Sequence, residues 1–172
     1  TADSRTEVVV FPERMGLGRN WNRCLRLARA DYIAFLHQDD VLTPDSIAER
    51  AGVLDAAPDV AMVYSDFRCI DASGCDIGGG HIANPKCSKL MDGGEFYGRA
   101  AWAGNPVACS SVMIRSSCYR AIGLFDERLC FAIDLEMWLR VAAKYRVGFV
   151  ARPLAKQRMH SLQEGARYRG TG

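Results

Sequence analysis

The sequence predicts a single α/β domain in which helices flank a mixed, mainly parallel sheet. Two observations support this prediction: short apolar runs alternate with helical patterns along the first 66 residues, and segments containing Gly or Pro separate them. A chain of 172 residues, 49% of them apolar and 24% charged, is long enough to bury a hydrophobic core. Because neither a repeat nor a linker stands out, we expect residues 1–172 to form one domain, with halves at 1–66 and 67–172.

The first half alternates three strands with two helices. The runs that predict strands are short, β-branched and aromatic, whereas the helices show apolar residues three or four positions apart. Pro44 occupies the first position of the second helix, and Pro58 closes it. Ile47, Ala51 and Leu54 form its expected buried face. The predicted strands cover residues 7–11, 32–36 and 60–67, and the predicted helices cover 16–30 and 44–56.

The second half is less regular. A turn at 71–74 predicts a hairpin, and the glycine-rich stretch 78–94 predicts a mobile loop. Ser116 is the expected cap of a helix that Gly123 ends. Strands are predicted over 112–115, 147–150 and 155–159, and helices over 95–102, 116–122 and 134–144. The last helix should bury the face that carries Leu135, Trp138, Leu139 and Ala142.

Composition excludes several classes of protein. A formal charge of +2 is too small to indicate a nucleic-acid partner, and no apolar run is long enough to span a membrane. The seven cysteines form no CxxC pair, which favours reduced thiols in a cytoplasmic protein. A basic stretch near the C-terminus indicates a solvated tail, with peripheral contact to an anionic membrane or a phosphate as the alternative. Its residues are Arg152, Lys156, Arg158, Arg167 and Arg169.

Asp39 and Asp40 mark the first candidate site. They directly follow the predicted strand 32–36, and open α/β sheets bind ligands at that edge. Adjacent carboxylates repel each other there, so a divalent cation is the simplest partner, and oxygen ligands favour Mg²⁺ or Mn²⁺. Such a cation would serve a phosphorylated ligand. In the alternative, Asp40 caps the next turn and Asp39 is solvated.

Two further candidates lie at the ends of predicted elements. Asp134 opens a helix, where its carboxylate can either act as a base in a cleft or cap the helix. Glu136 cannot share that task, because residues two apart on a helix point in nearly opposite directions. His160 follows the last predicted strand and is either a ligand or an ordinary structural histidine.

Five ordered segments form a recognisable set. A Gly- and Asn-rich helix precedes a strand that ends in two acids, and a second acidic helix precedes a closing Arg-x-His. Together they resemble the family 2 glycosyltransferases, which are inverting enzymes of the GT-A fold. The segments, which span nearly the whole chain, are 16–28, 32–40 with Pro44, 110–115 with 123–127, 133–140 and 158–160. The second resembles the family's Asp-x-Asp motif, and 133–140 resembles its Glu-Asp-x-Asp-x-Trp-x-x-Arg signature.

The resemblance implies a role for individual residues. Asp39 and Asp40 would bind Mg²⁺ or Mn²⁺, and His160 would support the metal or the diphosphate. Asp134 would be the general base that deprotonates the acceptor hydroxyl. Further candidates contact the donor or the acceptor. The donor set is Arg19, Asn20, His37 and Gln38, and the acceptor set is Asn105, Ser110, Ser111, Glu136 and Trp138.

The resemblance also implies a reaction. A sugar would pass with inversion from a UDP-, GDP- or dTDP-sugar to a glycan, lipid-linked or other hydroxyl acceptor. The expected setting is bacterial cell-surface polysaccharide synthesis, in the cytoplasm or at the inner face of the plasma membrane. Two other functions stay open. One is a metal-dependent nucleotide-sugar hydrolase or nucleotidyltransferase, and the other is a non-catalytic domain that binds glycan or a partner protein.

The chain departs from the family pattern at three places. His37 replaces the first Asp of Asp-x-Asp, which removes a negative charge from the metal site. Ile133 replaces the Glu that precedes the base. The family also has a nucleotide-binding strand ahead of the segment corresponding to 7–11, and we expect this chain to be truncated there. Residues 1–172 alone should then bind nucleotides weakly.

Overall fold

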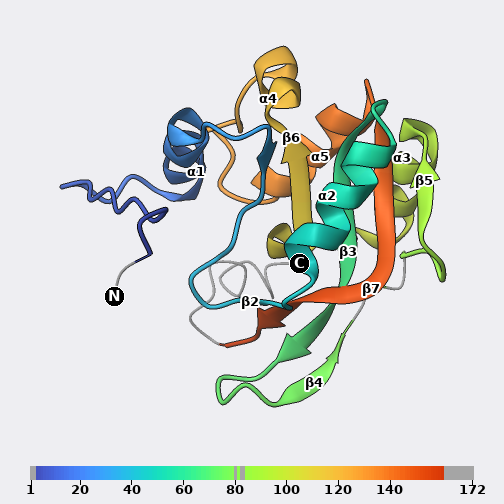
Figure 1. Ribbon diagram of the computed structural model, residues 1–172, viewed down its shortest axis with the longest axis horizontal. Helices are drawn as coiled ribbons and strands as arrows, with labels where there is room; N and C mark the ends of the chain where they lie inside the picture. The colour runs from blue at the N-terminus through green and yellow to red at the C-terminus, as the bar shows by residue number, and fades with distance from the viewer. Residues whose placement is uncertain (1–2, 80, 82–83, 161–172) are drawn as a thin grey trace.

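A mixed sheet forms the centre of the molecule (Figure 1). The computed structural model describes residues 3–79, 81 and 84–160. Within these residues the sheet has seven strands. Five of them follow the order β1-β6-β3-β7-β2; in addition, β4 pairs with β3 and β5 pairs with β7. The strands are β1 (Tyr32–Ile33), β2 (Val41–Leu42), β3 (Val60–Ile70), β4 (Asp76–Gly79), β5 (Lys89–Met91), β6 (Val112–Arg115) and β7 (Arg146–Arg158). The helices are α1 (Leu17–Leu27), α2 (Ser46–Ala56), α3 (Gly93–Ala103), α4 (Ser116–Ile122) and α5 (Ile133–Ala142), with a 3₁₀ turn η1 (Cys109–Ser111).

The mixed character of the sheet is confirmed, but the prediction that it is mainly parallel is wrong for the described strands. Only β3 and β7 pair in parallel there, and the other pairings are antiparallel. The alternation of strands and helices does make β1, β3 and β7 run in the same direction. However, β6 inserts between β1 and β3 with the opposite direction, so two antiparallel contacts replace the one parallel contact that β1 and β3 would make.

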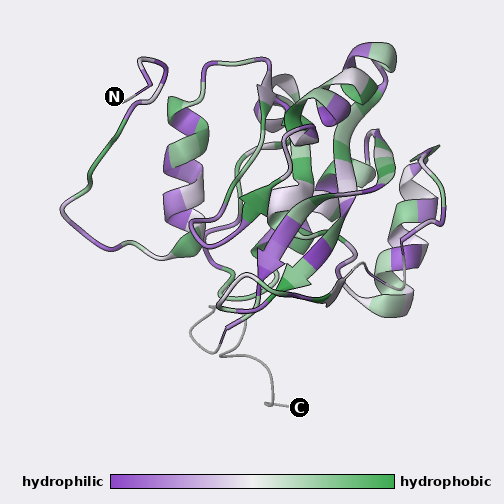
Figure 2. Ribbon diagram, turned by 60° about the horizontal axis from the view of Figure 1, so that its bottom comes forward, coloured by the Kyte–Doolittle hydropathy of each residue, from purple (hydrophilic) through white to green (hydrophobic). Residues whose placement is uncertain are grey.

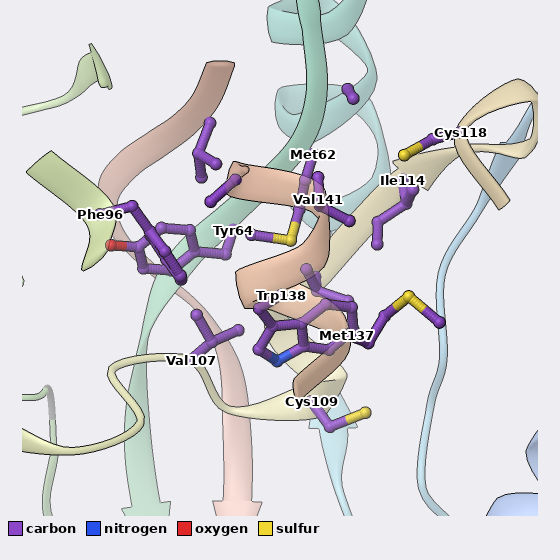
Figure 3. Packing of buried hydrophobic residues seen from close by; sticks show 14 of the residues in the cluster. Met62, Tyr64, Phe96, Val107, Cys109, Ile114, Cys118, Met137, Trp138 and Val141 are labelled. Carbon is purple, nitrogen blue, oxygen red and sulfur yellow. The ribbon is translucent and has the colours of Figure 1, made fainter. Parts of the chain in front are cut away.

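Helices cover both faces of the sheet. On one face α2 packs through Leu54 against Val63 of β3 and Met113 of β6. On the other face α3 and α5 enclose the larger core, where Phe96 and Trp138 lie near Tyr64 of β3 (Figure 3). Both hydrophilic and hydrophobic residues occur along the helices, as one packed face and one solvated face require (Figure 2). Strand β3 is buried on both faces because these two layers sandwich it.

The strand predicted at 7–11 is wrong. These residues form no strand, and Val8 and Val10 are 81% and 84% exposed. The segment runs away from the body of the molecule beside α1 (Figure 1). The guanidinium of Arg23 lies 4.0 Å from the centre of the Phe11 ring. An apolar run becomes a strand only where a neighbouring backbone pairs with it, and no described strand does so here.

Several predicted elements differ in their limits. Strand 32–36 shortens to β1, which is half-buried rather than buried, and Leu36 is 54% exposed. The predicted strands 147–150 and 155–159 form the single strand β7, whose register against β3 shifts near Pro153. The stretch 78–94 contains the end of β4 and all of β5, while residues 80, 82 and 83 lie outside the described part. The hairpin at 71–74 is confirmed between β3 and β4.

The helices are confirmed, with two corrections to their buried faces. In α2, Ile47 is 51% exposed and Arg50 is fully buried in its place. In α5, Met137 and Val141 enter the core with Trp138, whereas Leu135 is only half-buried. Ser116 is the first residue of α4 and does not cap it, while Gly123 ends the helix with a φ of 90°. No helix among the described residues is long and apolar enough to cross a membrane.

Candidate functional site

Asp40 is held rigidly where three segments meet. Its Oδ2 accepts a 2.6 Å hydrogen bond from Ser110 Oγ, and its Oδ1 accepts a 2.9 Å bond from the Arg158 backbone N–H. Only 3% of the side chain is exposed. Ser110 belongs to η1 and Arg158 ends β7, so both donors come from ordered elements. Each carboxylate oxygen accepts one hydrogen bond and keeps a lone pair for another partner.

Asp39 lies beside His160, as the motif order suggested. His160 Nε2 is 2.9 Å from Asp39 Oδ2, and both side chains are 28% exposed. Partial burial is the largest single influence on the pKa of Asp39 and raises it. The hydrogen bond with His160, a backbone hydrogen bond and the charges of His160 and His37 together outweigh burial and lower the pKa of the carboxyl. Arg158 Nε donates to the backbone carbonyl of Asp39 at 2.9 Å. Asp39 is therefore an ionised carboxylate that still faces solvent.

His37 completes the acidic segment, and we call residues 37–40 the acid loop. Its ring stacks on Trp21 with centroids 5.4 Å apart, and its backbone N–H donates to Ser110 Oγ at 3.2 Å. His37 Nδ1 is 3.9 Å from Asp40 Oδ2. Among the described groups, the buried Nε2 of His37 has no hydrogen-bond partner. One ring nitrogen of the imidazole is therefore buried without a described partner.

A divalent cation fits this loop. His37, Asp39 and Asp40 each offer one possible ligand atom, and these three atoms lie within 4.8 Å of one another. Two carboxylates suit Mg²⁺ and Mn²⁺, and an imidazole nitrogen suits Mn²⁺ better. The partly exposed Asp39 and the proximity of His37 Nδ1 to Asp40, 3.9 Å from Oδ2, agree with such a ligand set. His160 contacts Asp39 and can orient that carboxylate from behind.

Asp134 occupies the first turn of α5. The preceding Ala132 has a left-handed backbone with a φ of 54°, which is unusual for a residue other than glycine. Asp134 Oδ2 accepts a 2.8 Å hydrogen bond from Asn105 Nδ2, and Oδ1 accepts one from the Leu135 N–H at the same distance. Loss of solvent around the half-buried carboxyl raises its pKa, although both hydrogen bonds oppose this shift.

The acid loop and Asp134 belong to one region. Cys109 is buried within electrostatic reach of both, and its pKa is raised well above the ordinary value by burial and by the charges of Asp134 and Asp40. His37 in turn acts electrostatically on Asp134. The two carboxylate centres therefore lie within electrostatic range of each other, one on the loop after β1 and the other at the start of α5.

The remaining donor candidates are exposed. Arg19 Nε donates to Glu127 Oε2 at 3.2 Å, so its described ion pair is with that residue. Asn20 is exposed on α1, and Gln38 is exposed in the acid loop. The structure therefore brings His37 and Gln38 to the loop, while Arg19 is engaged elsewhere.

The acceptor candidates separate into two groups. Asn105 and Ser110 contact the acids directly. Ser111 and Trp138 are fully buried, and Ser111 Oγ donates to the Ala108 carbonyl. A fully buried indole offers no surface to a ligand, so the acceptor role expected for Trp138 does not fit its position in the core (Figure 3). Glu136 binds Arg140 through both carboxylate oxygens.

Three contributors to the site were missed by sequence reasoning. Arg158 was noted only within Arg-x-His and the basic C-terminal stretch, yet its backbone and side chain hold both acids of the loop. Trp21 is buried on α1, and its ring supports the His37 ring. Cys109 showed no distinguishing pattern. These contacts join residues more than 15 positions apart, so no local spacing reveals them.

Comparison with known proteins gives a family and a fold. The model of the family described as "Glycosyl transferase family 2" matches residues 1–79. An uncharacterized glycosyltransferase of Methanocaldococcus jannaschii is 23% identical over 158 residues, which cover 91% of this chain and 52% of that protein. The chain spans about half the length of the first curated relatives that it matches.

Two solved structures share the arrangement of sheet and helices. S. aureus TarS 1–349 in complex with UDP-GlcNAc matches with a TM-score of 0.68 and 14% identity, over 87% of this chain and 41% of that one. The mannosyltransferase PcManGT from Pyrobaculum calidifontis, in complex with GDP-Man and Mn²⁺, matches with a TM-score of 0.57 and 17% identity, over 91% and 40%. At these identities the likeness concerns the fold alone.

Proposed function

Because this chain is a family 2 glycosyltransferase domain with the GT-A fold, we propose that it transfers a sugar from a nucleotide-sugar donor to an acceptor hydroxyl with inversion. The observation that carries the proposal is the position of Asp134. It is a half-buried carboxylate with a raised pKa, at the start of α5 and within electrostatic range of the acid loop. A base and a centre that can hold a divalent cation, close enough to act on the same substrate, are what such a displacement needs.

Asp134 is the proposed general base. A raised pKa makes a carboxylate a better proton acceptor. Asn105 fixes the carboxylate through Oδ2, so its orientation is set before an acceptor arrives. The proton of the acceptor hydroxyl passes to Asp134 as the oxygen attacks the anomeric carbon. The nucleoside diphosphate leaves from the opposite side, which inverts the configuration at that carbon.

Asp39, Asp40 and His37 are the proposed holders of Mg²⁺ or Mn²⁺, with His160 behind Asp39. When bound, the cation would neutralise charge that develops on the departing diphosphate. The protein supplies the rigidity, because Ser110 and Arg158 hold Asp40 from two elements. The neighbours in complex with UDP-GlcNAc and with GDP-Man and Mn²⁺ support a nucleotide-sugar donor and a divalent cation. Asn105 and Ser110 are the proposed contacts to the acceptor side.

The proposed acceptor is a glycan, a lipid-linked saccharide or another hydroxyl compound, used in bacterial surface polysaccharide synthesis. The proposed location is the cytoplasm, with contact to the inner face of the plasma membrane. Of the basic residues considered for that contact, Arg152 pairs with Glu49 on α2 and with Asp45, which precedes that helix. Arg167 and Arg169 lie outside the described residues.

The test is acceptor-dependent transfer by the full-length protein. A panel of UDP-, GDP- and dTDP-sugars is incubated with Mn²⁺ and a glycan acceptor library, and product is detected by mass spectrometry. Asp134→Asn should lower kcat by at least about a hundredfold, the usual contribution of a general base. Asp59→Asn is the matched control, because Asp59 pairs with Arg146 on the surface and should leave transfer unchanged.

Two results would redirect the proposal. Release of nucleoside diphosphate without an acceptor, as the main activity, would favour a nucleotide-sugar hydrolase. Glycan binding with no turnover of any donor would favour a binding domain.

A further inference from the structure

Arg50 is a buried cation whose partners are all neutral. It lies on α2 with no exposed surface, and burial lowers its pKa to about 10. Its Nε and Nη2 donate to Ser46, at the carbonyl (2.9 Å) and at Oγ (2.8 Å). Its Nη1 donates to the carbonyls of Val112 (2.9 Å) and Ser110 (3.4 Å). Among the described hydrogen bonds, none joins it to a carboxylate.

Such an arrangement is costly for stability alone. Taking a guanidinium out of water carries a large desolvation penalty, and no opposite charge offsets it here. An apolar side chain would fill the same space beneath the sheet at lower cost. The function of Arg50 therefore depends on which groups its guanidinium N–H donors hold in place.

The fork holds the segment that supports Asp40. Ser110 and Val112 flank the end of η1, where the chain turns into β6. The other side of the turn is closed by Ser111, which donates to the Ala108 carbonyl through its N–H and its Oγ. Ser110 is thus fixed from both sides, and its Oγ donates to Asp40 and accepts from the His37 N–H.

We propose that Arg50 is a positioning residue for the acid loop: it fixes the Ser110 backbone so that Ser110 Oγ holds Asp40 in the orientation a divalent cation requires. The path runs from Arg50 through Ser110 to Asp40, and each step is a hydrogen bond between described atoms. The inference rests on the cation site of the proposed function. It adds a residue on α2, on the opposite face of the sheet from α5 and 10 positions after the acid pair.

The test uses two single variants, Arg50→Lys and Ser110→Ala. Lysine keeps the charge but cannot reach Ser46, Ser110 and Val112 together, because it has no planar fork. Alanine removes only the Oγ that links η1 to Asp40. Arg115→Lys is the matched control: Arg115 also donates to backbone carbonyls, those of Leu54, Ala57 and Val60, but it ties β6 to the α2–β3 connection.

Two readouts separate positioning from cation binding. NMR-detected hydrogen exchange of the Arg158 amide, which donates to Asp40, reports the orientation of Asp40 without metal. Titration of Mn²⁺ followed by electron paramagnetic resonance reports cation affinity directly. Arg50→Lys and Ser110→Ala should each speed exchange of that amide and weaken Mn²⁺ binding about tenfold, as loss of a group behind a ligand typically does. Arg115→Lys should lower Tm but change neither readout by more than about twofold.

The double variant decides whether the two residues act in one path. If they do, Arg50→Lys added to Ser110→Ala weakens Mn²⁺ binding by no more than about twofold further. If the two substitutions weaken Mn²⁺ binding independently, so that their fold-losses multiply, the proposal is overturned. It is also overturned if Ser110→Ala, which leaves the buried Arg50 contacts intact, does not change hydrogen exchange of the Arg158 amide. Faster exchange in a protein that binds no Mn²⁺ would uphold the positioning role and instead refute the cation site of the proposed function.

Discussion

The side-chain amide of Asn105 donates a 2.8 Å hydrogen bond to Oδ2 of Asp134. The bond joins the segment after α3 to the first turn of α5. These helices run antiparallel, since Gly93 at the start of α3 lies against Ala142 at the end of α5, and Tyr97 Oη donates to the Leu139 carbonyl. The orientation of the proposed base therefore depends on how two helices pack.

Replacing Asn105 by alanine should weaken transfer mainly at low pH. The amide stabilises the ionised form of Asp134, so its loss raises the pKa of that carboxyl further. The acidic limb of the kcat/KM profile should then move to higher pH. At the acidic end kcat/KM should fall by about tenfold, the worth of a hydrogen bond to a charged group. A limb that stays in place would show that Asn105 does not orient the base.

Replacing Asp134 by asparagine should stabilise the protein while slowing transfer. Burial raises the pKa of Asp134 above 3.8, so the folded state holds this proton more tightly than the unfolded chain. Stability from this group therefore falls as pH rises through the window between the unfolded and folded pKa values. We expect a gain on the order of 1 kcal/mol at pH 7 in urea unfolding, shrinking toward pH 3.

Replacing His160 by glutamine should weaken cation binding. His160 contacts Asp39 and lowers the pKa of that carboxyl, which favours the ionised ligand. We expect Mn²⁺ affinity to fall by roughly 10- to 100-fold in calorimetric titration, while Tm without metal changes little. The matched substitution is His81→Gln, because His81 lies in a different part of the chain. Equal losses in both variants would contradict a specific role for His160.

Two glycines of α3 should respond in opposite ways to alanine. A Cβ at Gly93 would lie 1.8 Å from the Ala142 carbonyl oxygen, whereas nothing lies within 4 Å of one at Gly98. Gly93→Ala should destabilise the protein by about 1–3 kcal/mol, because α3 and α5 must separate. Gly98→Ala should stabilise it by up to about 1 kcal/mol through helix propensity. Thermal unfolding of both variants checks the helix contact, and similar shifts would show that it is loose.

Trp138 should behave as a core residue. It is fully buried, and among the described atoms its indole N–H has no partner. Trp138→Ala should cost about 3–5 kcal/mol in denaturant unfolding. Trp138→Phe should cost no more than about 2 kcal/mol and leave the acceptor KM unchanged. A large rise in KM for Trp138→Phe without loss of stability would restore the acceptor role.

The sequence determined the local features of this protein. Helical spacing located α1, α2 and α5, and Gly123 marked the end of α4, because periodicity and backbone preference act within a few residues. The order of the acidic motifs anticipated that Asp39 and His160 would meet, although 121 residues separate them. An apolar run alone did not suffice at 7–11, where no described strand supplies a pairing partner.

Only the tertiary structure decided which groups face one another. The insertion of β6 between β1 and β3 changed the pairing of the sheet and brought Ser110 to Asp40. Burial of Arg50 in place of Ile47 on α2 reversed what hydrophobicity alone predicts, because carbonyls from a distant turn satisfy the guanidinium. Which side chain is buried on a helix therefore depends on hydrogen-bond partners from distant segments, and the local sequence pattern does not predict those partners.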